Sequence, residues 1–345
     1  MAIATAHAKV ILAGEHAVVY GHPAVAMPVC SLSCEVGIVD SPDGLTSFVA
    51  DAYPGRFLAG AHEEHPLSFL EDLLGWLFRD ELPRWGVELA GPPPLSISVR
   101  SEIPIGAGMG SSAAILVAAT RALFGHYGIT PPASEIQRLA HAAEMGVHGR
   151  SSGLDVAAAV HSAPVLFTTG EPAVSLSIGA PFDLLVARSG VQSLTRKVVL
   201  DVLERRKREP ALIDGLFTQM GGIARNLGEA IADGNLSGMG RLMNRNQELL
   251  ADLGVSSLDL DRLVAAAQEA GALGAKLTGA GRGGCIVALA EPVLVATIRE
   301  ALREAGAVEV HEYHVDPQVV AGNVARDPVM RVGGCSGQPR PQRVE

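Results

Sequence analysis

The feature that most constrains this chain is a glycine-rich segment between a strand pattern and a helix pattern. Leu95–Val99 alternates as a strand does, and an Ala-rich apolar helix is predicted from about Ser111 to Phe124. The joining sequence is PIGAGMGSSAA, whose glycines allow close backbone approach to a ligand. The N–H groups and the dipole at a helix N-terminus favour an anion. We therefore predict a phosphate site formed by Pro104, Gly106, Ala107, Gly108, Met109, Gly110, Ser111 and Ser112.

Two other phosphate-binding motifs are excluded by context. A dinucleotide-binding loop needs a differently placed third glycine and an acidic residue about 20 positions later, and position 126 has no acidic neighbour. A Walker A loop needs a Gly-Lys dipeptide, which the chain lacks.

A serine hydroxyl from Ser111 or Ser112 is an oxygen ligand of the kind Mg²⁺ prefers. A glycine turn that only lets the helix pack closely remains the alternative.

A second glycine-rich segment, KLTGAGRGGCIVAL, begins at Lys276. Gly279, Gly281 and Gly284 match the spacing of a dinucleotide motif, but a strand follows where that motif needs a helix. A loop between strands can instead close over a phosphate from another part of the fold. A tight hairpin without a ligand is the alternative interpretation.

Three further segments carry candidate side chains for phosphoryl transfer to an alcohol. Lys9 lies at an apolar strand that leads to Glu15 and His16, so it could stabilise developing negative charge while they orient a polar acceptor. Glu144 and Asp155 flank a Gly/Ser loop between two predicted helices. Glu144 is a candidate Mg²⁺ ligand, and Asp155 a candidate acceptor for the hydroxyl proton or a helix N-terminal acid. Thr195 is a weaker candidate for substrate contact, with a structural role as the alternative.

Composition limits the class of protein. The chain has 345 residues, of which 48% are hydrophobic, and this length suggests two domains. Strands and helices mix without regular βαβ alternation, which favours an α+β fold. The net charge of −10 argues against nucleic acid as a partner. We also expect no membrane partner and a cytoplasmic protein, because neither a signal peptide nor a long apolar segment is evident.

The pattern along the chain gives more local predictions. Val10–Leu12, Ala17–Tyr20, Ala24–Val29 and Ser33–Val39 are predicted strands, and residues 41–66 are predicted to be irregular. Residues 192–270 are predicted to be mainly helical. The expected domains cover residues 1–170 and 171–333. Residues 334–345 have the composition of a disordered tail.

Four of these segments together resemble the GHMP family of small-molecule kinases: the opening at Lys9–His16, the first glycine loop, the Glu144–Asp155 segment and the second glycine loop. The resemblance extends from Lys9 to Gly284, and the opening KVILAGEHAVVYGHPAVA is similar to that of mevalonate kinases. It implies a two-domain α+β fold with the active site in the cleft between the domains, often as a homodimer. It also implies ATP and mevalonate as substrates, with Mg²⁺ as cofactor.

The resemblance implies a role for each matching residue. Asp155 would be the catalytic carboxylate and Lys9 its electrostatic partner; together with Glu15 and His16 they would line the acceptor pocket. Ser112 and Glu144 would hold Mg²⁺. The first glycine loop would bind the nucleotide phosphates, and Gly279 and Gly281 of the second would support them.

Two departures leave the acceptor open. Mevalonate kinases usually have Asn after the catalytic Asp and a later Gly-Gly pair, whereas Val156 and Ala163-Pro164 occupy these places. The stretch Asp155-Val-Ala-Ala resembles phosphomevalonate kinases instead. The alternatives are therefore phosphomevalonate kinase, another kinase of the family and, more distantly, a nucleotide-binding relative without catalysis.

Overall fold

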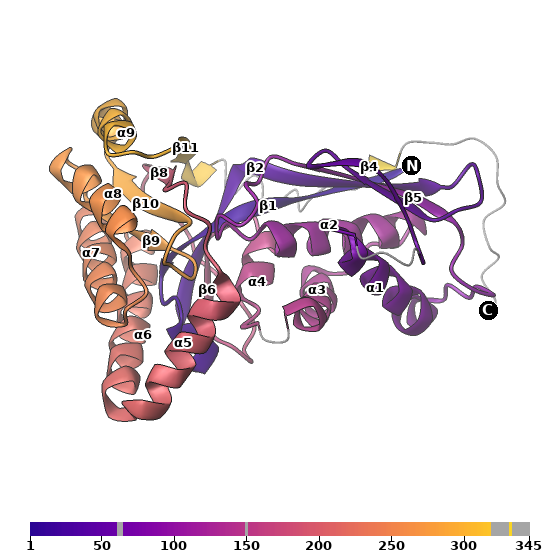
Figure 1. Cartoon of the computed structure of the whole chain (residues 1–345), viewed down its shortest axis with the longest axis horizontal. Helices are drawn as coiled ribbons and strands as arrows, with labels where there is room; N and C mark the ends of the chain where they lie inside the picture. Colours follow the sequence, from indigo (N-terminus) through magenta and orange to yellow (C-terminus); the bar gives the residue numbers. More distant parts are fainter. Residues whose placement is uncertain (61–64, 149–150, 319–330, 333–345) are drawn as a thin grey trace.

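The computed structural model of the protein describes residues 1–60, 65–148, 151–318 and 331–332. Their helices and strands form two sheets with helices packed on them, as an α+β fold requires (Figure 1). The larger sheet has the main order β12-β1-β2-β5-β3-β4, with β6 paired to β2 and β7 paired to β6. Its strands are β1 (Ala2–Ala13), β2 (Ala24–Asp40), β3 (Ser47–Ala50), β4 (Tyr53–Leu58), β5 (Leu95–Ser101), β6 (Val165–Phe167), β7 (Val174–Ser175) and β12 (Arg331–Val332).

Four helices lie beneath this sheet in the view of Figure 1. They are α1 (Ser68–Trp76), α2 (Ser111–His126), α3 (Ala133–His148) and α4 (Leu154–Val160). A π-helical turn (Leu77–Glu81) and a 3₁₀ turn (Leu82–Trp85) continue α1. Helix α2 is buried along most of its length and contacts β1, β2 and α3. Burial of its small Ala side chains lets the helix lie close to the sheet.

The smaller sheet is antiparallel in the order β11-β8-β10-β9. Its strands are β8 (Phe182–Arg188), β9 (Gly274–Thr278), β10 (Cys285–Ala290) and β11 (Glu309–Val315). Helices α7 and α8 contact β9, and α9 contacts β11 and β8. The helices of this part are α5 (Thr195–Arg208), α6 (Pro210–Ala232), α7 (Leu236–Asp252), α8 (Leu258–Glu269) and α9 (Val295–Glu304), the last after a 3₁₀ turn (Pro292–Leu294).

The β1–β2 pair connects the two parts of the molecule. Strand β1 contacts α6, α7 and β9, and β2 contacts α6 and β11. The backbone N–H of Ile11 donates to the Thr278 hydroxyl over 2.7 Å. The glycine loop before α2 and the loop after β9 consequently face each other, because β1 packs beside both. The expected division at residue 170 stays a prediction; the chain changes from the first sheet to the second between β7 and β8.

Most predicted elements are confirmed, and the differences lie near the N-terminus. Ala17–Tyr20 is a 3₁₀ helix and the strand prediction was wrong, because a four-residue apolar run has no distinguishing period. The two strands predicted within residues 24–39 are one long strand, β2. Residues 41–66 include β3 and β4, so the irregular prediction was also wrong there. The predicted tail at 334–345 lies outside the described residues.

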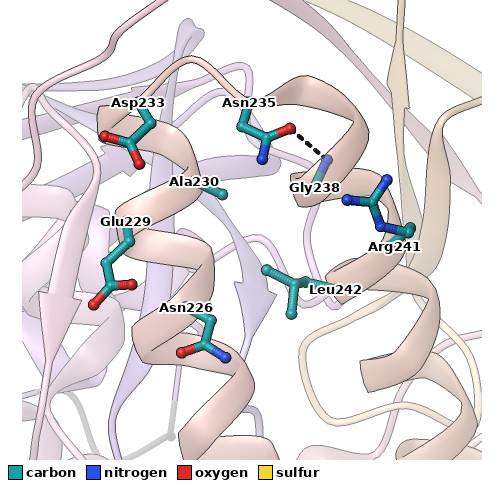
Figure 2. Close-up of a pocket in the computed structure, with 8 residues that line it drawn as sticks. All are labelled: Asn226, Glu229, Ala230, Asp233, Asn235, Gly238, Arg241 and Leu242. Carbon is teal, nitrogen blue, oxygen red and sulfur yellow. Dashed lines mark hydrogen bonds between the residues drawn. The ribbon is translucent and has the colours of Figure 1, made fainter.

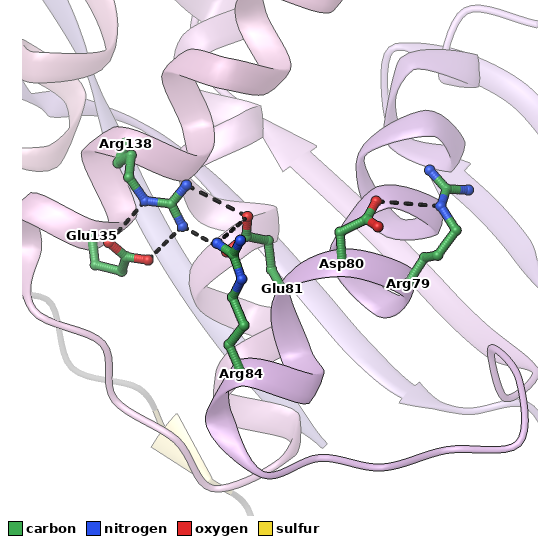
Figure 3. Close-up of polar contacts among 6 residues, drawn as sticks. All are labelled: Arg79, Asp80, Glu81, Arg84, Glu135 and Arg138. Carbon is green, nitrogen blue, oxygen red and sulfur yellow. Dashed lines mark hydrogen bonds and ion pairs between the residues drawn. The ribbon is translucent and has the colours of Figure 1, made fainter.

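A cluster of charged side chains holds the segment after α1 against α3 (Figure 3). The buried carboxylate of Glu81 pairs with Arg138 of α3 over 2.6 Å and with Arg84 over 3.3 Å. Arg138 also binds Glu135 one turn earlier, over 2.6 Å. Because both carboxylates share one guanidinium, the cluster fixes the N-terminal half of α3.

In the part of the chain that the structure describes, no helix is long and apolar enough to cross a bilayer.

Candidate active site

The first glycine loop enters α2 through three residues with left-handed backbone angles. Gly106, Gly108 and Gly110 have φ of 70°, 78° and 78°, and Gly110 is the N-cap residue of α2. Ala107 and Met109 between them are buried, so their side chains anchor the loop in the core. Pro104, Ser111 and Ser112 are half-buried. The N-terminus of α2, a long and well-packed helix, thus lies behind the loop, as an anion site requires.

Lys9 of β1 lies directly under this loop. Its side chain is only 2% exposed, and its Nζ donates to the Gly108 carbonyl over 2.9 Å. The Lys9 backbone N–H donates to the Met109 carbonyl over 3.0 Å. A register shift between His7 and Ala8 interrupts the β1–β2 pairing just before it. Irregularities of this kind re-aim side chains next to functional sites.

Asp155 occupies the first turn of α4, where the helix dipole favours a carboxylate. Its Oδ1 lies 3.0 Å from the Lys9 Nζ, and its side chain keeps 36% exposure. Gly153, with φ of 85°, is the N-cap residue of this short helix. Lys9 and Asp155 are therefore brought together from strand and helix, with the carboxylate still open to a ligand.

Glu144 approaches the same place from α3. It is 5% exposed, and its Oε2 accepts a hydrogen bond from the Ser151 hydroxyl over 2.5 Å. Burial, followed by the nearby charge of Asp155, raises the Glu144 pKa to about 7. The carboxylates of Glu144 and Asp155 and the ammonium of Lys9 act on one another electrostatically, and they carry a net negative charge when all three are ionised. The Glu144 carboxylate and the Ser112 hydroxyl are both oxygen donors of the kind that Mg²⁺ prefers, and their joint binding of a metal stays a prediction.

The second glycine loop packs backbone against backbone on the first. A Cβ atom on Gly279, whose φ is 86°, would lie 3.2 Å from the Gly108 carbonyl oxygen. A Cβ on Gly281 would collide with the Val255 carbonyl. The Gly281 carbonyl accepts from the Ser193 hydroxyl over 2.7 Å. Glycine is needed here for close approach, so the loop supports the first one and is more than a simple hairpin.

Glu15 is fully enclosed between β1 and the C-terminal part of the chain. Lys276 of β9 forms a buried ion pair with its Oε1, and Asn246 of α7 donates to its Oε2 over 3.0 Å. Burial raises the pKa of Glu15 and lowers the pKa of Lys276, while the mutual attraction of the two charges opposes both shifts. With both oxygens engaged and 1% exposure, Glu15 positions the turn that carries His16.

His16 bridges that turn to the second glycine loop. Its Nε2 lies 3.0 Å from the Ala280 carbonyl oxygen. Burial lowers its pKa to about 4, so the ring is neutral near pH 7. A carbonyl only accepts, so Nε2 carries the proton and Nδ1 is left as an acceptor. The residue has a φ of 60°, a region that few non-glycine residues occupy and that His adopts more often than most.

Thr195, the first residue of α5, is exposed. Among the described residues, no hydrogen bond or ion pair joins it to Lys9 or Asp155. Its neighbours do reach the loops: the Gln192 amide occupies the space beside Gly106, and Ser193 binds Gly281. Thr195 therefore stands at the edge of the assembled site, and its substrate contact stays a prediction.

Three residues of this assembly received no role from the sequence. Lys276 begins the second glycine motif, and its place in that motif was the available signal. Ser151 stands within the segment joining Glu144 to Asp155. Asn246 lies inside α7, where nothing in the local pattern distinguishes it.

A separate open pocket of about 360 Å³ lies between α6 and α7 (Figure 2). Glu229 of α6 and the C-cap residue Asp233 line it on one side, and the N-cap residue Asn235 and Arg241 of α7 line it on the other. None of the predicted site residues lines this pocket, so it is distinct from the assembly around Lys9 and Asp155.

Comparisons with known proteins show the family of this chain. Residues 76–163 match the model of the GHMP kinases N terminal domain, and residues 227–308 match that of the GHMP kinases C terminal. Mevalonate kinase of Thermococcus sibiricus is 32% identical, over 89% of this chain and 94% of its own length. Mevalonate kinase of Pyrococcus horikoshii is 33% identical, over 89% and 93%.

Solved structures show the same fold. L. major mevalonate kinase in complex with R-mevalonate has a TM-score of 0.73 and 29% identity, covering 91% of this chain and 96% of its own. Streptococcus pneumoniae phosphomevalonate kinase has a TM-score of 0.78 and 18% identity, covering 90% and 100%. The latter likeness concerns the fold alone.

Proposed function

This chain belongs to the GHMP kinase family, and we propose that it transfers the γ-phosphoryl group of ATP to the 5-hydroxyl of mevalonate, giving 5-phosphomevalonate. The observation that carries the proposal is the contact of Lys9 with both Asp155 and the Gly108 carbonyl. One buried cation thereby joins the carboxylate of the acceptor side to the loop of the phosphate side. Phosphoryl transfer asks a protein mainly for such positioning and charge neutralisation.

Each residue has a defined task in this proposal. Asp155 orients the acceptor hydroxyl or accepts its proton, and Lys9 stabilises the negative charge that develops on the attacking oxygen. The backbone of the loop at Gly106–Gly110 and the N-terminus of α2 bind the phosphates. Glu144 and Ser112 would hold Mg²⁺, which neutralises phosphate charge when bound. His16, whose Nε2 bonds the Ala280 carbonyl oxygen, would line the acceptor side.

The acceptor is assigned from the relatives and from one structural detail. The relatives with about a third of their residues identical are named mevalonate kinases. Val156, which departs from the usual Asn, has a fully buried side chain in the core. The departure from Asn therefore lies in the core and adds no positive group for a phosphorylated acceptor.

The experiment is ADP release with Mg²⁺ and ATP, measured in parallel with mevalonate, phosphomevalonate, homoserine and galactose. We expect turnover with mevalonate and none comparable with the other three. A preference for phosphomevalonate would reassign the acceptor and leave the site assignments in place. No ADP release with any of the four acceptors would contradict the proposed reaction.

The assembly state and the location are also proposals. We propose a homodimer in the cytoplasm, which rests on the family resemblance and on the lack of a long apolar segment. Sedimentation of the purified chain tests the first part, since a single species of monomer mass would contradict it.

A further inference from the structure

Ser151 links the two acidic residues of the site. Its hydroxyl donates to the Glu144 Oε2 over 2.5 Å and accepts from the Gly153 backbone N–H over 3.0 Å. Glu144 belongs to α3, whereas Gly153 is the N-cap residue of the helix that carries Asp155. A hydroxyl has one proton to donate, so the donor direction at Glu144 leaves its lone pairs for Gly153.

The backbone of Ser151 is held by the same helix. Its N–H donates to the Met145 sulfur over 3.1 Å, and its carbonyl oxygen lies 3.4 Å from the His141 Nε2. The His141 ring also covers Gly153, where a Cβ would lie 3.1 Å from the ring. Every polar group of Ser151 therefore has a partner on α3 or at the start of α4.

We propose that Ser151 is a positioning residue that fixes Glu144 and Asp155 relative to each other. The inference rests on the proposed kinase function. By occupying Oε2, Ser151 selects one rotamer of Glu144 and leaves Oε1 for a ligand; no hydrogen bond to Oε1 occurs among the residues that the structure describes. By accepting from Gly153, it sets the start of α4 and so the position of the Asp155 carboxylate.

The energetic reason is the sensitivity of phosphoryl transfer to geometry. A displacement of about 1 Å in a positioned group costs about 10²-fold in rate. Glu144 is buried, so without the hydroxyl its Oε2 loses the donor that holds it in one orientation. The α4 N-terminus simultaneously loses the acceptor for the Gly153 N–H, and α4 has only seven residues to hold its place.

The test uses the full chain with S151A and the matched pair S151T and S151V, which have the same shape and differ in the hydroxyl. S152A is the control, because among the residues that the structure describes the Ser152 hydroxyl accepts only from the nearby Leu154 N–H, over 3.3 Å. For S151A and S151V we expect kcat lower by about 30- to 100-fold, with KM values for ATP and mevalonate changed less than about threefold. S151T and S152A should stay within about fivefold of the parent.

A second measurement does not depend on turnover. Calorimetric titration gives the ATP affinity with and without Mg²⁺, and the gain that Mg²⁺ confers should shrink in S151A and S151V while surviving in S151T and S152A. If the parent chain turned over no acceptor, the proposed function would fail, but this titration would still test the positioning role of Ser151. The two proposals can therefore fail separately. Equal behaviour of S151T and S151V, or equal losses in S151A and S152A, would overturn the inference.

Discussion

The Nζ of Lys9 lies 3.0 Å from Oδ1 of Asp155 and donates to the Gly108 carbonyl, so one buried side chain contacts both halves of the reaction site. Lys9 is almost fully buried, whereas Asp155 keeps a third of its side-chain surface accessible. The pair is thus fixed at the lysine end and open at the carboxylate end. A substrate hydroxyl approaching Asp155 would meet a cation whose position is set before binding.

Asp155→Asn should keep ATP binding and lose turnover by about 10²- to 10⁴-fold, because the amide cannot take the hydroxyl proton. ADP release and calorimetric ATP titration measure the two effects. Asp183, which binds His314 on the smaller sheet, offers a matched control as Asp183→Asn. Turnover of D155N within tenfold of the parent would contradict the assigned role.

Lys9→Met should lower kcat by about 10²- to 10³-fold, since it removes the charge that stabilises the attacking oxygen. The stability loss should be small beside this, because Asp155 can be solvated where Lys9 was its partner. Steady-state kinetics and urea unfolding separate the effects. A variant whose kcat falls only in proportion to its folded fraction would show that Lys9 serves stability alone.

Gly279→Ala should weaken ATP binding as well as stability. The added Cβ must fit at a φ of 86° and 3.2 Å from the Gly108 carbonyl oxygen, so the two loops have to separate. Gly128→Ala is the matched control, with a φ of 70° and open space around the Cβ. We expect each to cost about 1–2 kcal/mol in unfolding free energy and only G279A to raise the ATP KM. Equal KM values in both variants would argue against contact between the loops in solution.

Lys276→Met should be strongly destabilising, by about 3–5 kcal/mol, because it leaves the Glu15 carboxylate buried without a counter-charge. The double variant with Glu15→Leu should recover much of this loss. At the exposed Glu204–Lys207 pair, Lys207→Ala should cost no more than about 1 kcal/mol. Urea unfolding of the parent, K276M, E15L and the double variant measures the coupling, with K207A as the exposed-pair control, and a double variant no more stable than K276M would refute it.

Glu144 should make stability depend on pH when no metal is bound. Its folded pKa of about 7 lies above the ordinary value of 4.5. The folded state then binds the proton more tightly, so the contribution is fully present below about pH 4.5 and is lost as pH rises through 7. Glu144→Gln should remove this slope. Urea unfolding in EDTA at pH 5, 6, 7 and 8 tests it, and parallel curves for parent and variant would contradict the shift.

Local sequence determined the elements that bear the chemistry. The alternating strand at Leu95, the three glycines and the Ala-rich run after Ser111 specify a strand, a loop and a helix without help from distant residues. The helix Leu154–Val160 likewise follows the Gly/Ser loop as predicted, with Asp155 in its first turn. Local pattern failed at Ala17–Tyr20, where four apolar residues are too few to define a period.

Only the tertiary structure decided which side chains meet. Lys9 contacts Gly108 and Asp155, and Glu15 contacts Lys276 and Asn246, across separations of up to 261 residues. Such contacts depend on how β1 packs between α2, α4 and β9, and that packing is set by burial over the whole chain. The sequence alone therefore predicted a phosphate loop and its candidate partners. Their assembly into one site, and the enclosure of Glu15, followed from long-range packing that no local period encodes.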